Sequence, residues 1–343
     1  MRNIYLVVLL MLSLNFSAMG EEVKIAIASI DQAWLSPKRS VELIKENAYI
    51  ASENGAGLIV FSESFIGGYP YWHYIHATID LNYNYEKYLD FYNASITKDG
   101  YEMKKLQSYA KRYKIAMIVP FNERNEDENY KSVYNSAVFI DKKGKIKHIT
   151  RKTRASHTEK LFWAEPKDPD IRVVKLAGIN VAYNSCWQTY LPLIRGIQYA
   201  QGAQLIVVGT QDQGEEWNSF IKSVALEGHV YLASVTQMYQ WEEIEKKDPE
   251  LAHEFKQVMN NVFKLIPPKI QTGDGMLIDP WGKVVIKGKS MESKLVYGII
   301  NTDENVKSSM YKDATTNYRL PIDVSYRGRQ YIKDGFAVDK IIK

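Results

Sequence analysis

The sequence predicts an α/β fold in which helices cover the faces of β-sheets. Short apolar runs, typical of strands buried on both faces, alternate along the chain with longer stretches of helical periodicity. Of the 343 residues, 45% are apolar and 24% are charged, which is a globular composition. A chain of this length can bury a sizeable core. No Pro-, Gly- or Ser-rich linker and no clean internal repeat interrupts the alternation, so we expect one domain over residues 21–343.

The first half of the chain alternates between predicted strands and helices. One helix is expected to begin after Ser36 or Ser40 as the N-cap and to stop at Gly55 and Gly57. A turn at Lys143-Gly144 joins two strands in a hairpin. The predicted strands are 23–28, 58–61, 115–120, 136–141 and 145–151, and the predicted helices are 41–54 and 99–113.

The second half repeats this order. A Pro-containing turn at 280–282 joins two strands in a hairpin. The predicted strands are 179–183, 205–208, 230–235, 276–279, 283–286 and 295–301, and the predicted helices are 191–201 and 217–227. The charged segment 241–269, which ends near Pro267-Pro268, interrupts the pattern and is expected to be helical. It can serve as a lid, as an oligomer contact or as a plain surface insertion.

The N-terminus reads as a secretory signal peptide. Arg2 is the only charged residue among the first 20, residues 4–12 are an unbroken apolar run, and Ala18 and Gly20 place small residues before a cleavage site after position 20. A buried first strand or a membrane anchor is the alternative, but the uncharged stretch is shorter than the roughly 20 residues that span a bilayer. We expect an exported protein, periplasmic or secreted, with no membrane attachment after cleavage.

Charge and motif content exclude several functional classes. The formal net charge is 44 − 40 = +4, and it becomes +3 once Arg2 is removed. These charges are dispersed, so nucleic acid is not an expected partner. The sequence holds no GxGxxG or P-loop motif and no Cys/His cluster with metal-ligand spacing. No nucleotide cofactor and no metal are therefore predicted.

Cys186 is the only cysteine in the chain. Exported proteins commonly pair their cysteines, but this one has no partner within the chain. It is either an inert buried residue or a thiol kept for its reactivity. Redox sensing is a further alternative, although no resolving cysteine accompanies it.

Three chemically distinct side chains follow directly on predicted strands. Glu63 comes after the strand at 58–61, Lys152 after the strand at 145–151, and Cys186 after the strand at 179–183. In open α/β sheets, functional residues gather beyond the carboxyl ends of strands. If the three meet, the carboxylate can take the thiol proton, while the ammonium favours the thiolate and stabilises negative charge on the attacked atom. The helix expected soon after the cysteine would add its positive dipole end.

The residues around these positions resemble the carbon–nitrogen hydrolase, or nitrilase, superfamily, and most closely the true nitrilase branch. The resemblance covers roughly residues 23–325, with the blocks in family order. Three blocks carry the catalytic set and two match later family segments: LIVFSESFIGGYPYW (58–72), TRKTRASHTEKLFW (150–163), NSCWQTYLPLIRGIQYAQGAQL (184–205), VALEGHVYLASVTQ (224–237) and GDGMLIDPWGKV (273–284).

This resemblance implies a four-layer αββα sandwich, a homodimer or larger homo-oligomer, and no cofactor. Its catalytic residues carry over to Glu63, Lys152, Glu159 and Cys186. The implied reaction is hydrolysis of a nitrile by water to a carboxylic acid and ammonia, through a covalent thioimidate and thioester on the cysteine. An amidase or N-carbamoyl hydrolase with the same residues is the alternative, and a non-catalytic secreted binding or assembly protein on this scaffold is a second one.

Aromatic residues and departures from the family pattern complete the prediction. Tyr69 and Trp187 are candidate substrate-binding residues, although aromatic residues at such positions also serve as core. His157 is either a proton shuttle or an exposed structural residue. The family commonly has proline where this chain has Ser62 and glutamate where it has Gln188. The loss of a carboxylate at 188 bears on the substrate and on the pH dependence.

Overall fold

The computed structural model describes residues 20–74, 81–126, 131–263, 269–290 and 292–312. Residues 1–19 of the predicted signal peptide, the Pro267-Pro268 pair and the C-terminal residues from 313 onward lie outside this range. Within it, no helix combines the length and the apolar character needed to cross a bilayer.

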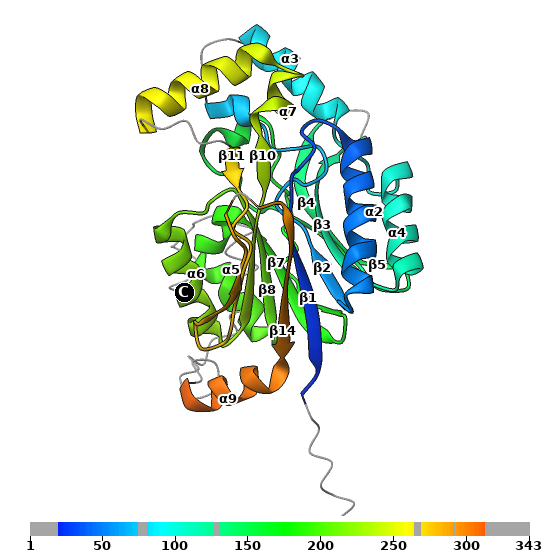
Figure 1. Cartoon of the computed structure of the whole chain (residues 1–343), viewed down its shortest axis with the longest axis vertical. Helices are drawn as coiled ribbons and strands as arrows, with labels where there is room; N and C mark the ends of the chain where they lie inside the picture. The colour runs from blue at the N-terminus through cyan, green and yellow to red at the C-terminus, as the bar shows by residue number, and fades with distance from the viewer. Residues whose placement is uncertain (1–19, 75–80, 127–130, 264–268, 291, 313–343) are drawn as a thin grey trace, which may run out of the picture.

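Two six-stranded sheets form the centre of the molecule (Figure 1). The first sheet has the order β14 (Lys294–Asn301), β1 (Glu22–Ser29), β2 (Leu58–Val60), β3 (Ala116–Arg124), β4 (Val133–Ile140) and β5 (Ile146–Arg151). The second has the order β13 (Val284–Lys287), β12 (Met276–Ile278), β9 (Tyr231–Thr236), β8 (Leu205–Thr210), β7 (Ile179–Ser185) and β6 (Val174–Leu176). Strands β1, β2 and β3 are parallel in the first sheet, and strands β7, β8 and β9 are parallel in the second. The other pairings in both sheets are antiparallel.

Helices cover the outer face of each sheet, as Figure 1 shows. The first sheet is covered by α2 (Pro37–Glu53) and α4 (Tyr101–Tyr113), and the second by α5 (Pro192–Ala200) and α6 (Glu215–Gly228). Residues of α2 at helical spacing, including Val41, Ile44 and Ala48, are buried against the first sheet. Because the stripe repeats every three or four residues, one face of the helix packs and the other remains solvated.

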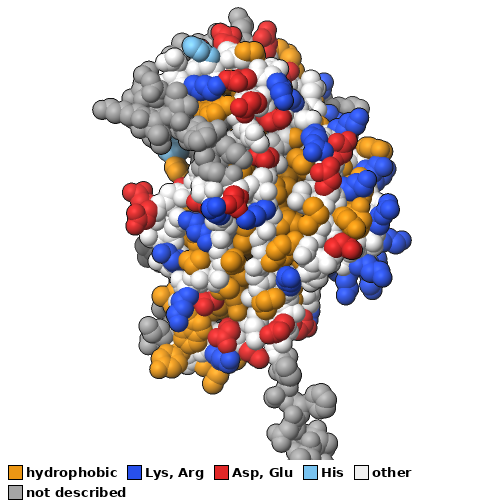
Figure 2. Space-filling model, viewed as in Figure 1, with side chains coloured by type: hydrophobic (Ala, Val, Ile, Leu, Met, Phe, Trp, Pro, Cys, Tyr) orange, Lys and Arg blue, Asp and Glu red, His pale blue; other side chains and the backbone are white. Residues whose placement is uncertain are grey.

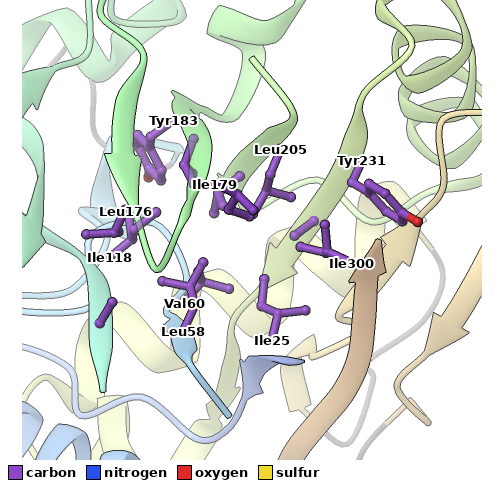
Figure 3. Packing of buried hydrophobic residues seen from close by; sticks show 14 of the residues in the cluster. Ile25, Leu58, Val60, Ile118, Leu176, Ile179, Tyr183, Leu205, Tyr231 and Ile300 are labelled. Carbon is purple, nitrogen blue, oxygen red and sulfur yellow. The ribbon is translucent and has the colours of Figure 1, made fainter. Parts of the chain in front are cut away.

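The main hydrophobic core lies between the two sheets (Figure 3). The short strand β2 shows how the layers arise from its sequence. Leu58 and Val60 point into the space between the sheets, whereas Ile59 packs under the helices of the first sheet. A strand buried on both faces needs a continuous apolar run, and the predicted run at 58–61 supplies it. The molecule is a mixed α/β protein with the αββα layering that the resemblance implies.

Most predicted elements are present with shifted ends, and several elements were not predicted. Ser36 is the N-cap residue of α2, but its side chain makes no capping hydrogen bond, and Pro37 begins the helix instead. The segment 241–269 contains α7 (Trp241–Glu245) and α8 (Pro249–Phe263), as expected, and ends at β11 (Lys269–Thr272), which pairs with β10 (Met238–Gln240). The unpredicted helices are η1 (Tyr71–Tyr74), α3 (Leu81–Asn93), η2 (His157–Leu161), η3 (Cys186–Tyr190) and α9 (Thr302–Lys312).

Candidate active site

The backbone at Cys186 changes direction sharply. Ser185 is the last residue of β7, and Cys186 follows with a φ of +47°. This left-handed conformation is costly for a residue with a side chain, and such residues concentrate at functional sites. The chain then makes the short 3₁₀ turn η3 before α5 begins at Pro192. The helix predicted over 191–201 is therefore present, but η3 separates its N-terminus from the thiol.

Glu63, Lys152 and Glu159 form one buried ionic cluster. The Lys152 ammonium donates to Glu63 Oε1 at 3.1 Å and to Glu159 Oε2 at 2.8 Å. All three residues are buried, with exposed fractions of 0% for Glu63, 4% for Lys152 and 2% for Glu159. Breaking such a buried pair is strongly destabilising, because it leaves a charge without a partner. Glu63 follows β2, Lys152 follows β5 and Glu159 lies in η2, and the fold brings the three side chains together.

Each carboxylate is held by further donors. Glu63 Oε1 also accepts from Ser185 Oγ at 2.7 Å and from Asn135 Nδ2 at 2.9 Å. Glu159 caps its own turn η2 by accepting from the Ser156 backbone N–H at 2.7 Å, and its other oxygen accepts from Tyr69 Oη at 2.6 Å. These bonds fix both carboxylates in one orientation.

Glu63 retains one unoccupied oxygen. Within the described part of the chain, Glu63 Oε2 has no hydrogen-bond partner although it is fully buried. Burial raises the pKa of Glu63, although the Lys152 ammonium and the hydrogen bonds from Ser185 and Asn135 act in the opposite direction. A buried carboxylate with a raised pKa and a free oxygen is suited to accept and return a proton.

The Cys186 thiol lies within the electrostatic reach of this cluster. It is buried, and Thr210 Oγ1 donates to its sulfur at 3.3 Å. Burial, reinforced by the carboxylates of Glu63 and Glu159, raises the pKa of the thiol to about 12, and the Lys152 ammonium only partly opposes them. The sequence suggested that the lysine would favour the thiolate. In the structure, desolvation and two negative charges outweigh one positive charge, so the resting sulfur is protonated.

Lys152 and Glu159 stay charged. Burial alone would lower the pKa of Lys152, but the carboxylates of Glu159 and Glu63 raise it above its usual value. Burial alone would raise the pKa of Glu159, but Lys152 and the donors around it hold that pKa below its usual value. The site therefore combines a fixed ammonium–carboxylate pair with a second carboxylate that can exchange a proton.

The two candidate substrate-binding residues lie in different surroundings. Tyr69 is buried and contacts the catalytic cluster through Glu159. Trp187 is 41% exposed, and its indole N–H donates to Asp212 at 2.9 Å. Its ring packs against the ring of the exposed His157. This arrangement fits His157 as a surface residue rather than as a proton shuttle.

Sequence reasoning missed several residues that hold the site. Asn135 and Thr210 contact the catalytic carboxylate and the sulfur, but each lies within a strand, where nothing in the spacing singles it out. The polar pair Asn135-Ser136 inside the otherwise apolar run 133–140 is the one available signal for Asn135. Gln188 Oε1 accepts from the Thr153 backbone N–H at 2.7 Å and ties the lysine loop to the nucleophile turn.

The described residues show no ready-made metal site. Within the ranges given above, no group of three or more His, Cys, Asp and Glu side chains is placed to hold a metal ion.

Comparisons with known proteins agree with the geometry. The family model described as carbon-nitrogen hydrolase matches residues 24–305. A nitrilase of Penicillium rubens is 23% identical over 89% of this chain and 92% of its own length. A nitrilase of Meyerozyma guilliermondii is 31% identical over 51% of this chain, which spans 55% of that protein.

A solved structure has the same fold. Nit3 of Saccharomyces cerevisiae, described as a member of branch 10 of the nitrilase superfamily, superimposes with a TM-score of 0.67 at 12% identity. The superposition covers 88% of this chain and 98% of that one.

Proposed function

The chain belongs to the carbon–nitrogen hydrolase family, and we propose that it hydrolyses a nitrile to the carboxylic acid and ammonia through a covalent intermediate on Cys186. The observation that carries the proposal is the free oxygen of Glu63 in a buried cluster whose charges act on the Cys186 thiol. The nitrilases among its relatives support the substrate class.

The first half of the proposed reaction forms the carbon–sulfur bond. Glu63 Oε2 takes the thiol proton while the sulfur attacks the nitrile carbon, and the proton passes to the nitrile nitrogen, which gives a thioimidate. Because the pKa of the thiol is about 12, proton removal and attack must be coupled. Lys152, oriented by Glu159, stabilises the negative charge that develops on nitrogen.

The second half consumes two water molecules. Water activated by Glu63 adds to the thioimidate carbon, the carbon–nitrogen bond breaks, and ammonia leaves a thioester. A second water cleaves the thioester, which releases the acid and returns the proton to sulfur. An amide would enter the same sequence at the tetrahedral adduct and lose ammonia directly to the thioester, so an amidase or N-carbamoyl hydrolase would use the same four residues.

Ammonia release from matched nitriles and amides tests the proposal. The wild-type protein should release ammonia from a nitrile such as butyronitrile faster than from butyramide, and a rapidly quenched reaction should show the acyl mass on the Cys186 peptide. Cys186→Ala and the near-isosteric Cys186→Ser should both lose turnover. Full nitrile hydrolysis by either variant would exclude the cysteine mechanism. Preference for the amide would make the protein an amidase, and absence of turnover on every class would favour a binding protein.

We further propose that the protein is exported and forms at least a homodimer. The N-terminal signal pattern supports export. Hydrophobic side chains gather on the face seen in Figure 2, and exposed large hydrophobic residues include Val284 on β13, Ile299 on β14 and Met310 on α9. Sizing of the purified protein with light scattering tests the oligomer, and N-terminal sequencing of the exported product tests cleavage after residue 20.

A further inference from the structure

Two buried glutamines are linked through one tyrosine hydroxyl. Gln237 Nε2 donates to Tyr71 Oη at 3.1 Å, and Tyr71 Oη donates to Gln211 Oε1 at 3.0 Å. Gln237 is fully buried and Gln211 is 8% exposed. Within the described part of the chain, the remaining amide atoms, Gln211 Nε2 and Gln237 Oε1, have no hydrogen-bond partner. The proposed reaction uses neither of them.

These glutamines follow the ends of two neighbouring strands, one of which contacts the proposed nucleophile. Thr210 and Thr236 are register partners and the last residues of the parallel strands β8 and β9, and each glutamine is the first residue after its strand. The hydroxyl of Thr210 donates to the Cys186 sulfur. Gln211 therefore follows the strand end that contacts the thiol, and Gln237 follows the strand paired with it.

The tyrosine that links them reaches the other side of the catalytic cluster. The rings of Tyr71 and Tyr69 pack with centroids 5.3 Å apart, and the Tyr69 hydroxyl donates to Glu159. The glutamine pair is thus connected to the catalytic groups in two ways, along the chain through Thr210 to the Cys186 sulfur and through the packed rings of Tyr71 and Tyr69 to Glu159.

The chemistry of the free atoms indicates what they bind. A buried polar group without a partner costs about 1–3 kcal/mol, so such groups suggest a ligand that completes them. Gln211 Nε2 is a hydrogen-bond donor, and Gln237 Oε1 is an acceptor. A hydroxyl group satisfies both at once, because it can accept from an amide N–H and donate to an amide oxygen. A hydrocarbon chain would leave both unsatisfied.

The charge of the site excludes an acidic partner at this position. The charges that act on Cys186 are two carboxylates and one ammonium, and the ammonium is already paired with both carboxylates. An anionic substituent would add a third negative charge to a buried site that has no spare cation among these groups. The substituent that fits is polar and uncharged.

We infer that the substrate is a short, uncharged nitrile that carries a hydroxyl group near the reacting carbon, held by Gln211 and Gln237. This inference rests on the proposed function and narrows its substrate class. A site built to hydrogen-bond a hydroxyl discriminates strongly against the analogue that lacks it, because its own polar groups are then left unpaired.

Two substrate pairs in which a hydroxyl replaces a methyl group test the inference. They are 2-hydroxypropionitrile with isobutyronitrile, and 3-hydroxypropionitrile with butyronitrile. For the wild-type protein, kcat/KM should favour the hydroxylated member of at least one pair by about tenfold or more. Ammonia release gives the rates, and no variant is needed for this first result.

Variants then assign the preference to the glutamines. Gln211→Leu and Gln237→Leu should each bring the ratio of hydroxylated to unhydroxylated substrate close to one. Gln107→Leu, the same change on α4 at a residue that bonds the Gly144 carbonyl far along the chain, should retain the wild-type ratio. Thermal unfolding establishes whether each variant is folded. If a variant does not fold, the wild-type ratio of kcat/KM for the hydroxylated and unhydroxylated nitriles still tests the inference.

The outcomes separate this inference from the proposed function. Hydrolysis of all four nitriles without preference for a hydroxyl would overturn the inference and leave the nitrilase proposal intact, with ordered water as the occupant of the two amides. A wild-type preference that survives both glutamine substitutions would also overturn the assignment. Failure to hydrolyse any nitrile would overturn the function and the inference together.

Discussion

The hydroxyl of Ser185 controls the proton affinity of the proposed general base. It donates to Glu63 Oε1 at 2.7 Å in a buried environment, and this bond lowers the pKa of a carboxyl group that burial raises. Ser185→Ala removes this donor and the contact of the same hydroxyl with Asn135 Oδ1 at 3.2 Å, whereas alanine retains the Cβ and the backbone at this strand end. The carboxylate form of Glu63 then loses stabilisation, and its pKa must rise.

The size of the effect follows from the type of bond. A hydrogen bond to a charged group contributes about 1.5–3 kcal/mol, and one pKa unit corresponds to about 1.4 kcal/mol. We therefore expect the pKa of Glu63 to rise by about one to two units in Ser185→Ala. Since Glu63 must be ionised to take the thiol proton, activity is lost as the pH falls through this pKa. The acid limb of the activity profile should move to higher pH by the same amount.

The measurement is kcat/KM as a function of pH, whose acid limb reports the essential base in the free enzyme. Ser62→Ala is a matched control because Ser62 is also buried and adjoins Glu63, yet its hydroxyl has no partner among the described residues. Its acid limb should coincide with that of the wild type. If Ser185→Ala leaves the acid limb in place, or moves it to lower pH, then Glu63 is not the base that the profile reports.

Three further predictions address neighbouring contacts. Gly209→Ala should lower the free energy of unfolding by about 1–3 kcal/mol in urea denaturation, because the alanine Cβ would lie 2.9 Å from the Glu63 backbone nitrogen. Unchanged stability would contradict this close approach between the two sheets. Tyr69→Phe should lower kcat/KM about tenfold by removing a donor worth about 1.5–3 kcal/mol to Glu159, and full activity would show that this bond does not orient the cluster. Gln188→Glu keeps an acceptor oxygen but adds a negative charge two residues from the nucleophile. This charge should raise the pKa of Glu63, so the acid limb of the kcat/KM profile should move to higher pH. A shift to lower pH would refute the electrostatic reasoning.

The sequence predicted the layered fold because its strands are marked by local patterns. The run Leu58–Val60 is apolar throughout, and the fold buries both of its faces. Helix α3 was missed because residues 81–93 are rich in tyrosine and asparagine and show little apolar periodicity. The helix predicted over 191–201 is present as α5, which begins at Pro192, a residue favoured in the first turn of a helix. The short 3₁₀ turn η3 before it was missed, because five residues are too few to show a periodic pattern.

The catalytic set could be predicted in outline, whereas its supporting contacts could not. Lys152 and Cys186 directly follow strands and Glu63 lies three residues beyond one, so a rule about strand ends finds them. Asn135, near the start of β4, bonds Glu63, and its place along the sheet is set by the register of β4 against β3, where it lies opposite Asn122. Contacts that depend on register and on the packing of two sheets are not encoded in any local pattern.

The high pKa of the thiol has a consequence for the direction in which charge moves during the reaction. Before attack, the negative charge of the base rests on Glu63, where Lys152 and two neutral donors stabilise it. In the proposed mechanism, proton transfer neutralises this carboxyl group as negative charge develops on the substrate nitrogen. The Lys152 ammonium loses one anionic neighbour at the moment another forms, while Glu159 holds it in place. A buried cation whose partner is neutralised during the attack interacts more strongly with the transition state than with the resting substrate, and only such differential binding accelerates the chemical step.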